Sequence, residues 1–385
     1  MSCCLVCGTP GLLAIERFAQ MPRITSDCRP FPKGGELAQC PRCTAVQKYP
    51  AKRWLAEIEQ IYAHYAPYHQ AEGNEQLSAD ARQGRLRPRS AILMERLCER
   101  IALPGQGTML DVGCGNGATL RAFSEKRPLW NLEGCEMSDR AIEKLREIER
   151  FSALHTCPIS AIRSKYDVVT MVHSLEHFVD PLAVLKDVTG ILDDDGQLFI
   201  EVCNIEENPF DVLIADHLMH FSPLTLPMLL ARAGLESVAV ATDWISKEIS
   251  AVAKRVGRQQ IFPRVARDPR VRGWGRIDAT LNWLGVFLQA ARNVAEKSSR
   301  FGLFGTSISG TWLASQLADS VHFFVDEDPS RTGKTHLGRP VLSPGQVAEE
   351  SDVYLALTPA VARVVFARLS GHPGRYILPP GEPFA

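Results

Sequence analysis

The sequence predicts an α/β protein with a doubly wound sheet at its centre, a cysteine-rich segment before it and a smaller α/β domain after it. Three observations support this. Apolar runs of strand length alternate with helical segments from residue 108 to about 242, which indicates a parallel sheet with helices on both faces. Two Cys-x2-Cys pairs stand near the amino terminus, and strand–helix alternation returns after residue 299.

The chain has 385 residues, which is enough for two or three domains. The composition shifts along it predict four parts. We expect a zinc-binding module over residues 1–60, the sheet core over 61–245, a helical connector over 246–298 and the second α/β domain over 299–385.

The overall composition argues against a protein that binds nucleic acid through its net charge and against one that spans a membrane. Hydrophobic residues make up 45% and charged residues 23%, as in a soluble globular protein. The net charge of −1 gives no overall field for nucleic acid, and no apolar run approaches the length of a membrane span. The first residues, "MSCCLVCGTP", lack the basic and apolar regions of a signal peptide, so we expect a cytoplasmic protein.

The cysteine pairs predict a metal site. Cys4 and Cys7 form one pair and Cys40 and Cys43 the other, and each pair can present two thiolates from a tight turn. Two such turns complete a tetrahedral zinc site with no position left for water, so its role is structural. A redox pair and unliganded thiols are the alternatives.

Residues 51–100 are predicted to be mainly helical. The segment "RWLAEIEQIYAHYAPYH" has apolar residues at helical spacing and carries Tyr62, Tyr65 and Tyr68. A polar stretch over about 70–90 predicts a surface connection or lid before the next amphipathic helix.

The core region alternates regularly. Strands are expected over 108–113, 131–137, 166–175, 196–204 and 236–244, with helices over 118–126, 138–149, 181–192 and 222–235. Ser138 is a candidate cap for the second of these helices.

The turn "DVGCGNG" joins the first strand to the first helix. Gly113, Gly115 and Gly117 let a ligand lie against backbone, and Asp111 precedes them. A P-loop is excluded because no Gly-Lys-Ser/Thr follows. Glu136 follows Gly117 at the offset expected of a carboxylate that accepts ribose hydroxyls. The turn therefore predicts an adenosine-like ligand; a nicotinamide site or an empty turn is the alternative.

At this point "LDVGCGNG" with Glu136, then "YDVVTMVHSLEHFVDP" and "LFIEVCN", resembles the class I S-adenosylmethionine-dependent methyltransferases over roughly residues 90–240. The resemblance implies that Asp111 and the three glycines hold the methionine part of S-adenosylmethionine and that Glu136 holds the ribose. One departure is the absence of an acid ahead of Asp167, where the family often contacts the adenine amine.

Two histidine clusters are candidates for a general base. "HSLEHFVDP" follows a core strand at the sheet's carboxyl edge and carries His177. "IADHLMHFSPLTL" carries Asp216 beside His217, where the carboxylate is expected to set the imidazole's tautomer and pKa, and then His220. The alternatives are helix capping and partly exposed bystanders.

The whole layout resembles the zinc-containing sugar C-methyltransferases, with a Rossmann-like carboxyl-terminal domain. The resemblance implies that Asp216 and His217 correspond to a Glu-His pair whose histidine removes the proton next to a 3-keto group, and that the enolate takes the methyl. It also implies that Tyr62, Tyr65 or Tyr68 binds the sugar, and we expect His220 among the substrate-binding residues. Asp replaces Glu at 216, and Ile214 replaces the family's tyrosine.

A second glycine turn, "FGLFGTSISG", carries Gly302, Gly305 and Gly310, and Asp326 ends the next predicted strand. The turn predicts either a site for the nucleotide or phosphate part of a substrate or a domain that only packs.

These observations predict an S-adenosylmethionine-dependent methyltransferase acting on a small molecule, a nucleotide-linked or glycan-precursor sugar, by histidine-assisted C-methylation. O- or N-methylation of another metabolite and a non-catalytic S-adenosylmethionine-binding protein are the alternatives. A basic strip over 254–276 leaves open a nucleic-acid or protein methyltransferase whose zinc module reads the polymer.

Overall fold

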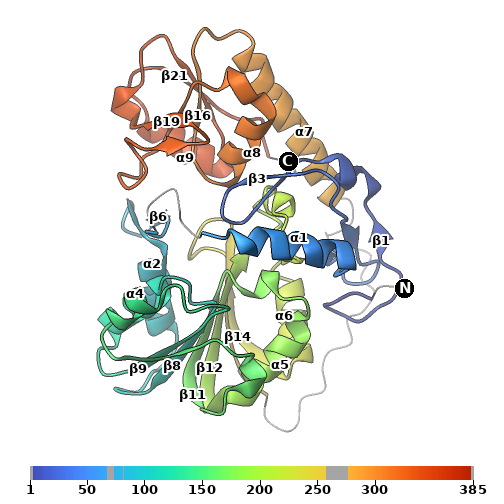
Figure 1. Ribbon diagram of the computed structural model, residues 1–385, viewed down its shortest axis with the longest axis vertical. Coiled ribbons are helices and arrows are strands. Elements are labelled where there is room, and N and C mark those ends of the chain that lie inside the picture. The colour runs from blue at the N-terminus through green and yellow to red at the C-terminus, as the bar shows by residue number, and fades with distance from the viewer. Residues whose placement is uncertain (1–2, 67–72, 81, 257–275, 383–385) are drawn as a thin grey trace.

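A computed structural model describes residues 3–66, 73–80, 82–256 and 276–382. Figure 1 shows the central sheet at the bottom of the view, the carboxyl-terminal domain at the top and the amino-terminal segment beside both. Among the described helices none is both long enough and apolar enough to cross a membrane.

The central sheet has seven strands in the order β10-β9-β8-β11-β12-β15-β14. Every neighbouring pair is parallel except the two that β15 makes, because β15 runs antiparallel to both β12 and β14. The bounds are β8 Thr108–Val112, β9 Asn131–Cys135, β10 Phe151–His155, β11 Tyr166–Val172, β12 Leu192–Cys203, β14 Leu235–Ala241 and β15 Glu248–Arg255.

Helices cover both faces of this sheet because successive strand residues point to opposite sides. Met109 and Val168 pack with α2, α3 and α4, whereas Leu110 and Val169 pack with α5 and α6. The bounds are α2 Arg89–Arg100, α3 Ala118–Lys126, α4 Ile142–Arg146, α5 Pro181–Ile191 and α6 Thr225–Arg232.

The amino-terminal segment forms a four-stranded sheet in the order β1-β4-β5-β13. Its last strand comes from the core region, where Met219 and His220 pair antiparallel with Gln47 and Val46. The bounds are β1 Leu13–Ala14, β2 Arg23–Ile24, β3 Pro30–Phe31, β4 Ala38–Gln39, β5 Val46–Gln47, β13 Met219–His220 and α1 Lys52–Ala63, with the 3-10 helix η1 over Glu16–Gln20. This segment and the core region therefore share one sheet.

The carboxyl-terminal sheet has the order β18-β19-β17-β16-β20-β21 and is parallel except for β18. The bounds are β16 Phe301–Phe304, β17 Phe323–Val325, β18 Thr335–His336, β19 Arg339–Leu342, β20 Asp352–Leu355, β21 Arg375–Ile377, α7 Arg276–Ala295, α8 Ile308–Leu317 and α9 Pro359–Arg368. One apolar cluster joins this sheet to the amino-terminal segment, with Phe18 and Ile24 packed among residues of α7 and α8. The indole of Trp312 donates to the Pro22 carbonyl across 3.1 Å.

Three sequence expectations differ from these elements. The range expected to be a connector, 246–298, begins with β15, whose buried run pairs inside the central sheet and makes that sheet mixed. The helix expected over 138–149 is only Ile142–Arg146. The expected polar connection holds a hairpin of β6 (Leu77–Asp80) and β7 (Arg85–Pro88), which the polar composition concealed.

Candidate functional site

The glycine turn after β8 needs its three glycines for two different reasons. All three have positive φ, which side-chain-bearing residues rarely adopt. A Cβ on Gly113 would lie 2.6 Å from the Ser174 Cβ, and one on Gly117 would lie 2.6 Å from the Leu145 Cδ2, so these two are required by packing. A Cβ on Gly115 would meet nothing within 4 Å. Gly115 is therefore the position at which a ligand can approach the backbone.

Glu136 lies against the open part of this turn. Its Oε2 accepts the Gly115 N–H across 3.0 Å, and its Oε1 accepts the Met137 N–H across 2.8 Å. Asp111 is buried at the end of β8, where its Oδ1 accepts the Thr170 hydroxyl across 2.6 Å. Burial raises the pKa of Asp111 to about 7. The two carboxylates thus occupy different positions, one facing the turn and one inside the strand layer.

Tyr62 of α1 and His177 of η4 (Leu175–His177) meet although they are far apart in sequence. The Tyr62 hydroxyl lies 3.0 Å from the His177 Nδ1, which also lies 3.1 Å from the Asp216 carbonyl oxygen. Burial raises the pKa of Tyr62, and the charges of Asp216 and, more weakly, Glu136 add to the effect. Ser174, which directly precedes η4, lies against Gly113, so the glycine turn and the histidine site are neighbours.

The carboxylate partner of His217 is Asp211 rather than the adjacent Asp216. Asp211 accepts from the His217 Nδ1 through one oxygen and from the His220 Nδ1 through the other, both across 2.7 Å. Asp216 instead accepts the Ser26 N–H across 2.8 Å. The physical reason is that the 3-10 turn η5 (Asp211–Leu213) brings Asp211 to His217, whereas the Asp216 carboxylate lies against Ser26 and, at 3.4 Å, the His177 Nδ1.

His177 and His217 face each other edge to face, with ring centroids 4.7 Å apart. Burial lowers the pKa of His177, and the nearby His217 lowers it further. Burial also disfavours charge on His217, but the hydrogen bond and charge of Asp211 outweigh it and raise the pKa. Two imidazoles in contact are thus shifted in opposite directions, an arrangement found where acid–base roles are divided.

The amino-terminal segment fixes the backbone next to His217. Lys48, fully buried after β5, donates its Nζ to the carbonyls of Ile214 and His217, the latter across 2.8 Å. The Trp54 indole donates to the Ala215 carbonyl across 3.1 Å. Burial lowers the pKa of Lys48 to about 7. Neither Asp211 nor Lys48 was a sequence candidate, because a lone acid in "NPFDVL" and a lone lysine carry no motif.

The three candidate tyrosines are placed differently. Tyr62 lies at His177 as described, whereas the Tyr65 hydroxyl accepts from the Ser26 hydroxyl across 3.3 Å and contacts the edge of the Tyr62 ring. Tyr68 lies outside the described residues.

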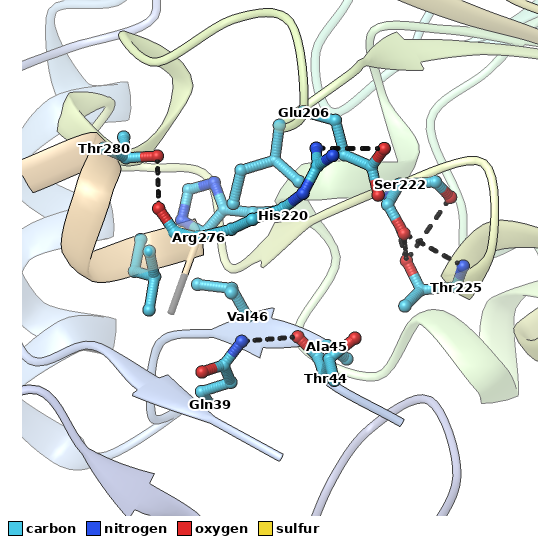
Figure 2. Close-up of a pocket in the computed structure, with 12 residues that line it drawn as sticks. Gln39, Thr44, Ala45, Val46, Glu206, His220, Ser222, Thr225, Arg276 and Thr280 are labelled. Carbon is cyan, nitrogen blue, oxygen red and sulfur yellow. Dashed lines mark hydrogen bonds and ion pairs between the residues drawn. The ribbon is translucent and has the colours of Figure 1, made fainter. Parts of the chain in front are cut away.

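His220 lines a pocket, shown in Figure 2, whose lining residues do not include His177. The pocket lies between the amino-terminal sheet, α6 and α7, and includes Ser222, Thr225 and the 3.3 Å ion pair of Arg276 with Glu206. The His220 Nε2 is buried and has no hydrogen-bond partner among the described residues. Its expected contact with substrate would therefore occur in this pocket and not beside His177.

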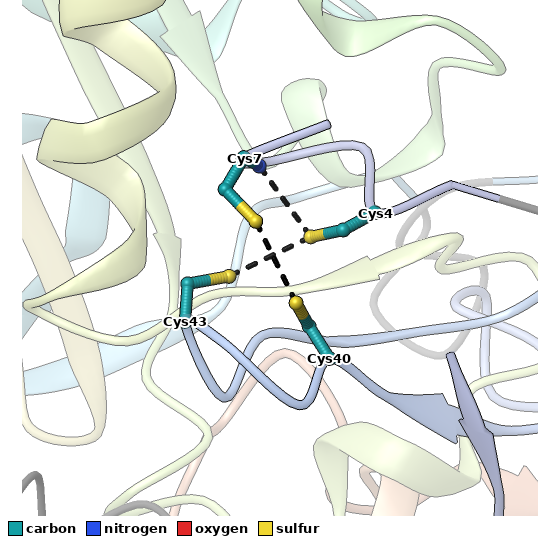
Figure 3. Close-up of side chains that lie close together, drawn as sticks. All are labelled: Cys4, Cys7, Cys40 and Cys43. Carbon is teal, nitrogen blue, oxygen red and sulfur yellow. Dashed lines mark hydrogen bonds between the residues drawn. The ribbon is translucent and has the colours of Figure 1, made fainter. Parts of the chain in front are cut away.

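The four amino-terminal cysteines converge on one point, as Figure 3 shows. The Cys4 and Cys43 sulfurs are 3.5 Å apart, as are those of Cys7 and Cys40, and all four lie within 4.8 Å of one another. A tetrahedral four-thiolate zinc site places its sulfurs about 3.8 Å apart. Hydrogen bonding to the Cys40 sulfur and burial together raise the pKa of Cys4 to about 12. The donor atoms therefore fit zinc in number, element and spacing.

The second glycine turn is occupied by its own side chains. Asp326 accepts the Thr306 hydroxyl across 2.8 Å and pairs with Arg331 across 3.5 Å. A Cβ on Gly310 would lie 1.9 Å from the Gly305 carbonyl oxygen, so close packing of α8 on the turn explains that glycine. Packing therefore explains Gly310, and the alternatives of a ligand site and a domain that only packs stay predictions.

Comparison with known proteins points to one family. Residues 81–240 match the model of a methyltransferase domain family. The chain is 30% identical over 137 residues to the ubiquinone biosynthesis O-methyltransferase of Pseudomonas paraeruginosa, covering 32% of this chain and 57% of that protein. It is 28% identical over 159 residues to the protein of the same name from Xanthomonas campestris pv. campestris, covering 36% and 62%. The chain thus spans little more than half the length of the curated relatives it matches.

Among solved structures, the mitomycin 7-O-methyltransferase MmcR aligns with a TM-score of 0.39 and 19% identity, covering 43% of this chain and 54% of that one. The sequence match takes in β8 to β12, the glycine turn, Glu136 and both histidine segments, which are the parts that build the site described above. Residues 81–240 are therefore similar in sequence to the methyltransferase domain family whose model they match.

Proposed function

We propose that this protein is an S-adenosylmethionine-dependent methyltransferase whose acceptor is a small molecule, a nucleotide-linked or glycan-precursor sugar. The observation that carries the proposal is the pair His177–His217, held by Tyr62 and Asp211 next to the turn that carries Gly115. A nucleotide-type turn beside two imidazoles with opposite pKa shifts suits a group transfer that includes removal of a proton.

The donor would bind at the glycine turn. S-adenosylmethionine supplies an electrophilic methyl group on a sulfonium, so the protein mainly positions the two reactants. Gly115 leaves its outer side open for the ligand, and Gly113 and Gly117 hold the shape of the turn. Glu136 is placed to exchange its contact with the Gly115 N–H for ribose hydroxyls. Asp111 supports the turn from inside the strand layer.

The acceptor would bind against the histidines. His217, oriented through its Nδ1 by Asp211, takes the proton from the carbon next to a carbonyl through its Nε2, and the C–H electrons form an enolate. The enolate carbon then forms its bond to the methyl group as the methyl–sulfur bond breaks. Tyr62 and His177 line the same site and are assigned to sugar contacts. Asp216 contributes by fixing Ser26 through its carboxylate and the His177 ring through its carbonyl oxygen and carboxylate.

The four-cysteine cluster is proposed to hold a structural zinc ion. Four thiolates close the coordination shell, so the ion has no position for a reactant. Its contribution is to order the turns that precede β5, and with them Lys48, which donates to the backbone on either side of Asp216. Zinc thus supports the position of His217 through the protein chain.

O-methylation of a sugar or another metabolite is the second candidate. Two observations favour it: the matched curated relatives carry the name O-methyltransferase, and Ile214 offers no hydrogen-bond donor for an enolate oxygen. In that case His217 would take a hydroxyl proton instead of a carbon-bound one.

The test is label transfer from methyl-labelled S-adenosylmethionine to a panel of nucleotide sugars, with donor binding followed by calorimetry. Keto sugars are then incubated in heavy water without donor. Exchange of the α-proton that is lost in His217→Ala supports carbon methylation; methyl transfer without exchange supports oxygen or nitrogen as acceptor. Absence of both donor binding and transfer would overturn the enzyme assignment.

A further inference from the structure

Three potential metal ligands meet where the central strands end, and one of them, His173, contacts Glu176. His173 follows β11, Cys203 ends β12 and Glu248 begins β15. One donor atom from each lies within 4.8 Å of the other two. Cys203 and Glu248 are direct cross-strand partners, and the His173 N–H donates to the Glu201 carbonyl across 2.8 Å. Strand register therefore fixes the three donors in one place.

Two of these donors are buried without the hydrogen bonds that buried polar atoms normally make. The His173 Nε2 and the Glu248 Oε2 have no hydrogen-bond partner among the described residues, although they lie 3.3 Å apart. Glu248 is only 8% exposed. A buried carboxylate oxygen and a buried imidazole nitrogen left unsatisfied cost free energy unless a further group lies between them.

The surroundings of His173 have the arrangement that accompanies a metal-bound imidazole. Its other ring nitrogen, Nδ1, lies 3.3 Å from the Glu176 Oε1, so a carboxylate can fix the tautomer with Nε2 as the free donor. Both His173, with φ of 50°, and Lys247, with φ of 71°, have left-handed backbone conformations that such residues rarely adopt.

The charge balance also favours a cation. Glu176 and Glu201 are both buried beside this group, and each has a carboxylate oxygen with no hydrogen-bond partner in the described structure. Arg89 and Lys247 are the cations that act on these groups from α2 and from the start of β15. A divalent ion would add positive charge at the point where three carboxylates gather.

We propose that His173, Cys203 and Glu248 bind a divalent transition-metal ion, at a site separate from the four-cysteine cluster. One nitrogen, one sulfur and one oxygen ligand suit Zn²⁺ or Co²⁺ better than Mg²⁺ or Ca²⁺. Binding breaks the Cys203 S–H bond, forms a metal–sulfur bond and releases the proton to solvent. Three protein ligands leave a coordination position open, as catalytic metal sites do and structural ones do not. The site does not depend on methyl transfer.

The experiment uses the full chain with its amino-terminal cluster loaded with zinc. Co²⁺ is added, unbound ion is removed by gel filtration, and zinc and cobalt per chain are counted by mass spectrometry while thiolate-to-cobalt absorption is recorded. We expect zinc to be retained and one cobalt to be gained. Cys203→Ser should lose the absorption, and Glu248→Gln and Glu176→Gln should weaken cobalt binding by about 10- to 100-fold. Cys157→Ser, an exposed thiol outside the group, is the matched control and should behave as wild type.

Two results would overturn the site: no cobalt beyond that replacing zinc in the wild-type protein, or unchanged absorption in a folded Cys203→Ser variant. Circular dichroism establishes that each variant is folded, and Glu248→Gln provides a test independent of any misfolding at Cys203. Donor binding is measured on the same samples. Donor binding without cobalt uptake removes this inference alone, and cobalt uptake without donor binding removes the methyltransferase proposal alone.

Discussion

Asp211 accepts the Nδ1 proton of His217 across 2.7 Å, although five residues separate the two in the chain. Its second oxygen makes the same contact with His220, so one carboxylate orients two imidazoles and both Nε2 atoms keep their lone pairs. One of these rings lies against His177 and the other lines the pocket of Figure 2. Asp211 is therefore the residue on which the orientation of both histidines depends.

Asp211→Asn should lower kcat/KM by on the order of 10²- to 10⁴-fold, because an amide can stabilise neither the required tautomer nor a protonated His217. Donor affinity, measured by calorimetry, should change little, since Asp211 does not touch the glycine turn. Asp216→Asn is the comparison. If that variant lost more activity than Asp211→Asn while remaining equally stable, the sequence-based pairing of Asp216 with His217 would be restored.

The pH dependence of kcat/KM should follow His217. Its pKa is raised above about 6.5, and the base must be neutral to act, so the acidic limb should have its midpoint above pH 6.5. In Asp211→Asn burial dominates, and the midpoint should move to lower pH. The raised pKa of His217 should also affect stability, but it favours low pH instead of high pH. The contribution of His217 to the free energy of unfolding is complete below pH 6.5 and is lost as pH rises through the folded-state pKa. Denaturant unfolding across this range measures it.

Gly115→Ala and Gly117→Ala should fail in different ways. A methyl at 115 stands in open space, so the protein should fold but bind S-adenosylmethionine at least about tenfold more weakly. A methyl at 117 would overlap Leu145 and should destabilise the fold by about 1–3 kcal/mol. Gly234 also has a positive φ and open space but lies after α6, so Gly234→Ala controls for backbone strain. Equal donor affinity in the 115 and 234 variants would contradict the site.

Tyr62→Phe should reduce kcat/KM roughly tenfold while leaving the fold intact, because it removes only the hydroxyl 3.0 Å from the His177 Nδ1. Steady-state kinetics with acceptor and donor varied separately should place the loss on the acceptor side. Tyr376→Phe, which removes a hydroxyl that donates to Pro344 in the carboxyl-terminal domain, is the matched control. A loss confined to the donor KM would show that Tyr62 serves the donor site instead.

Cys43→Ser should lower the zinc content of the protein and its thermal midpoint together, since metal binding and folding of such turns are coupled. Methyl transfer should fall with them because Lys48 and Trp54 hold the backbone beside His217. Cys3→Ser, at an exposed neighbouring position, should keep both zinc and midpoint. A stable, active Cys43→Ser protein without zinc would show that the ion is dispensable.

The fold could be predicted from sequence as far as local patterns reached. The alternation from Thr108 onward gave an α/β sheet because buried parallel strands and amphipathic helices have distinct periods. β15 was missed because an antiparallel strand that returns into a parallel sheet has no pattern of its own, and its basic end resembles a loop. The hairpin β6–β7 was missed because strands rich in polar residues carry no apolar alternation.

The candidate site was predictable only where a motif marks it. The glycines and Glu136 follow a recognised spacing, and the two Cys-x2-Cys pairs identified four sulfurs that the structure brings together. The partner of His217 was not predictable, because a hydrogen bond between residues 211 and 217 depends on the turn η5 and not on adjacency. The role of Lys48 was not predictable either, because its acceptors are backbone carbonyls from a segment far along the chain.

The pairing of β13 with β5 has a consequence for the order of events during synthesis. Until Met219 and His220 emerge from the ribosome, β5 pairs with β4 alone and is the open edge of this sheet next to the cysteine turns. A nascent chain that ends before residue 219 cannot complete this sheet, however early its cysteines capture zinc. The cysteine-bearing segment, although it precedes the core region in the chain, thus completes its sheet only after much of that region has been made.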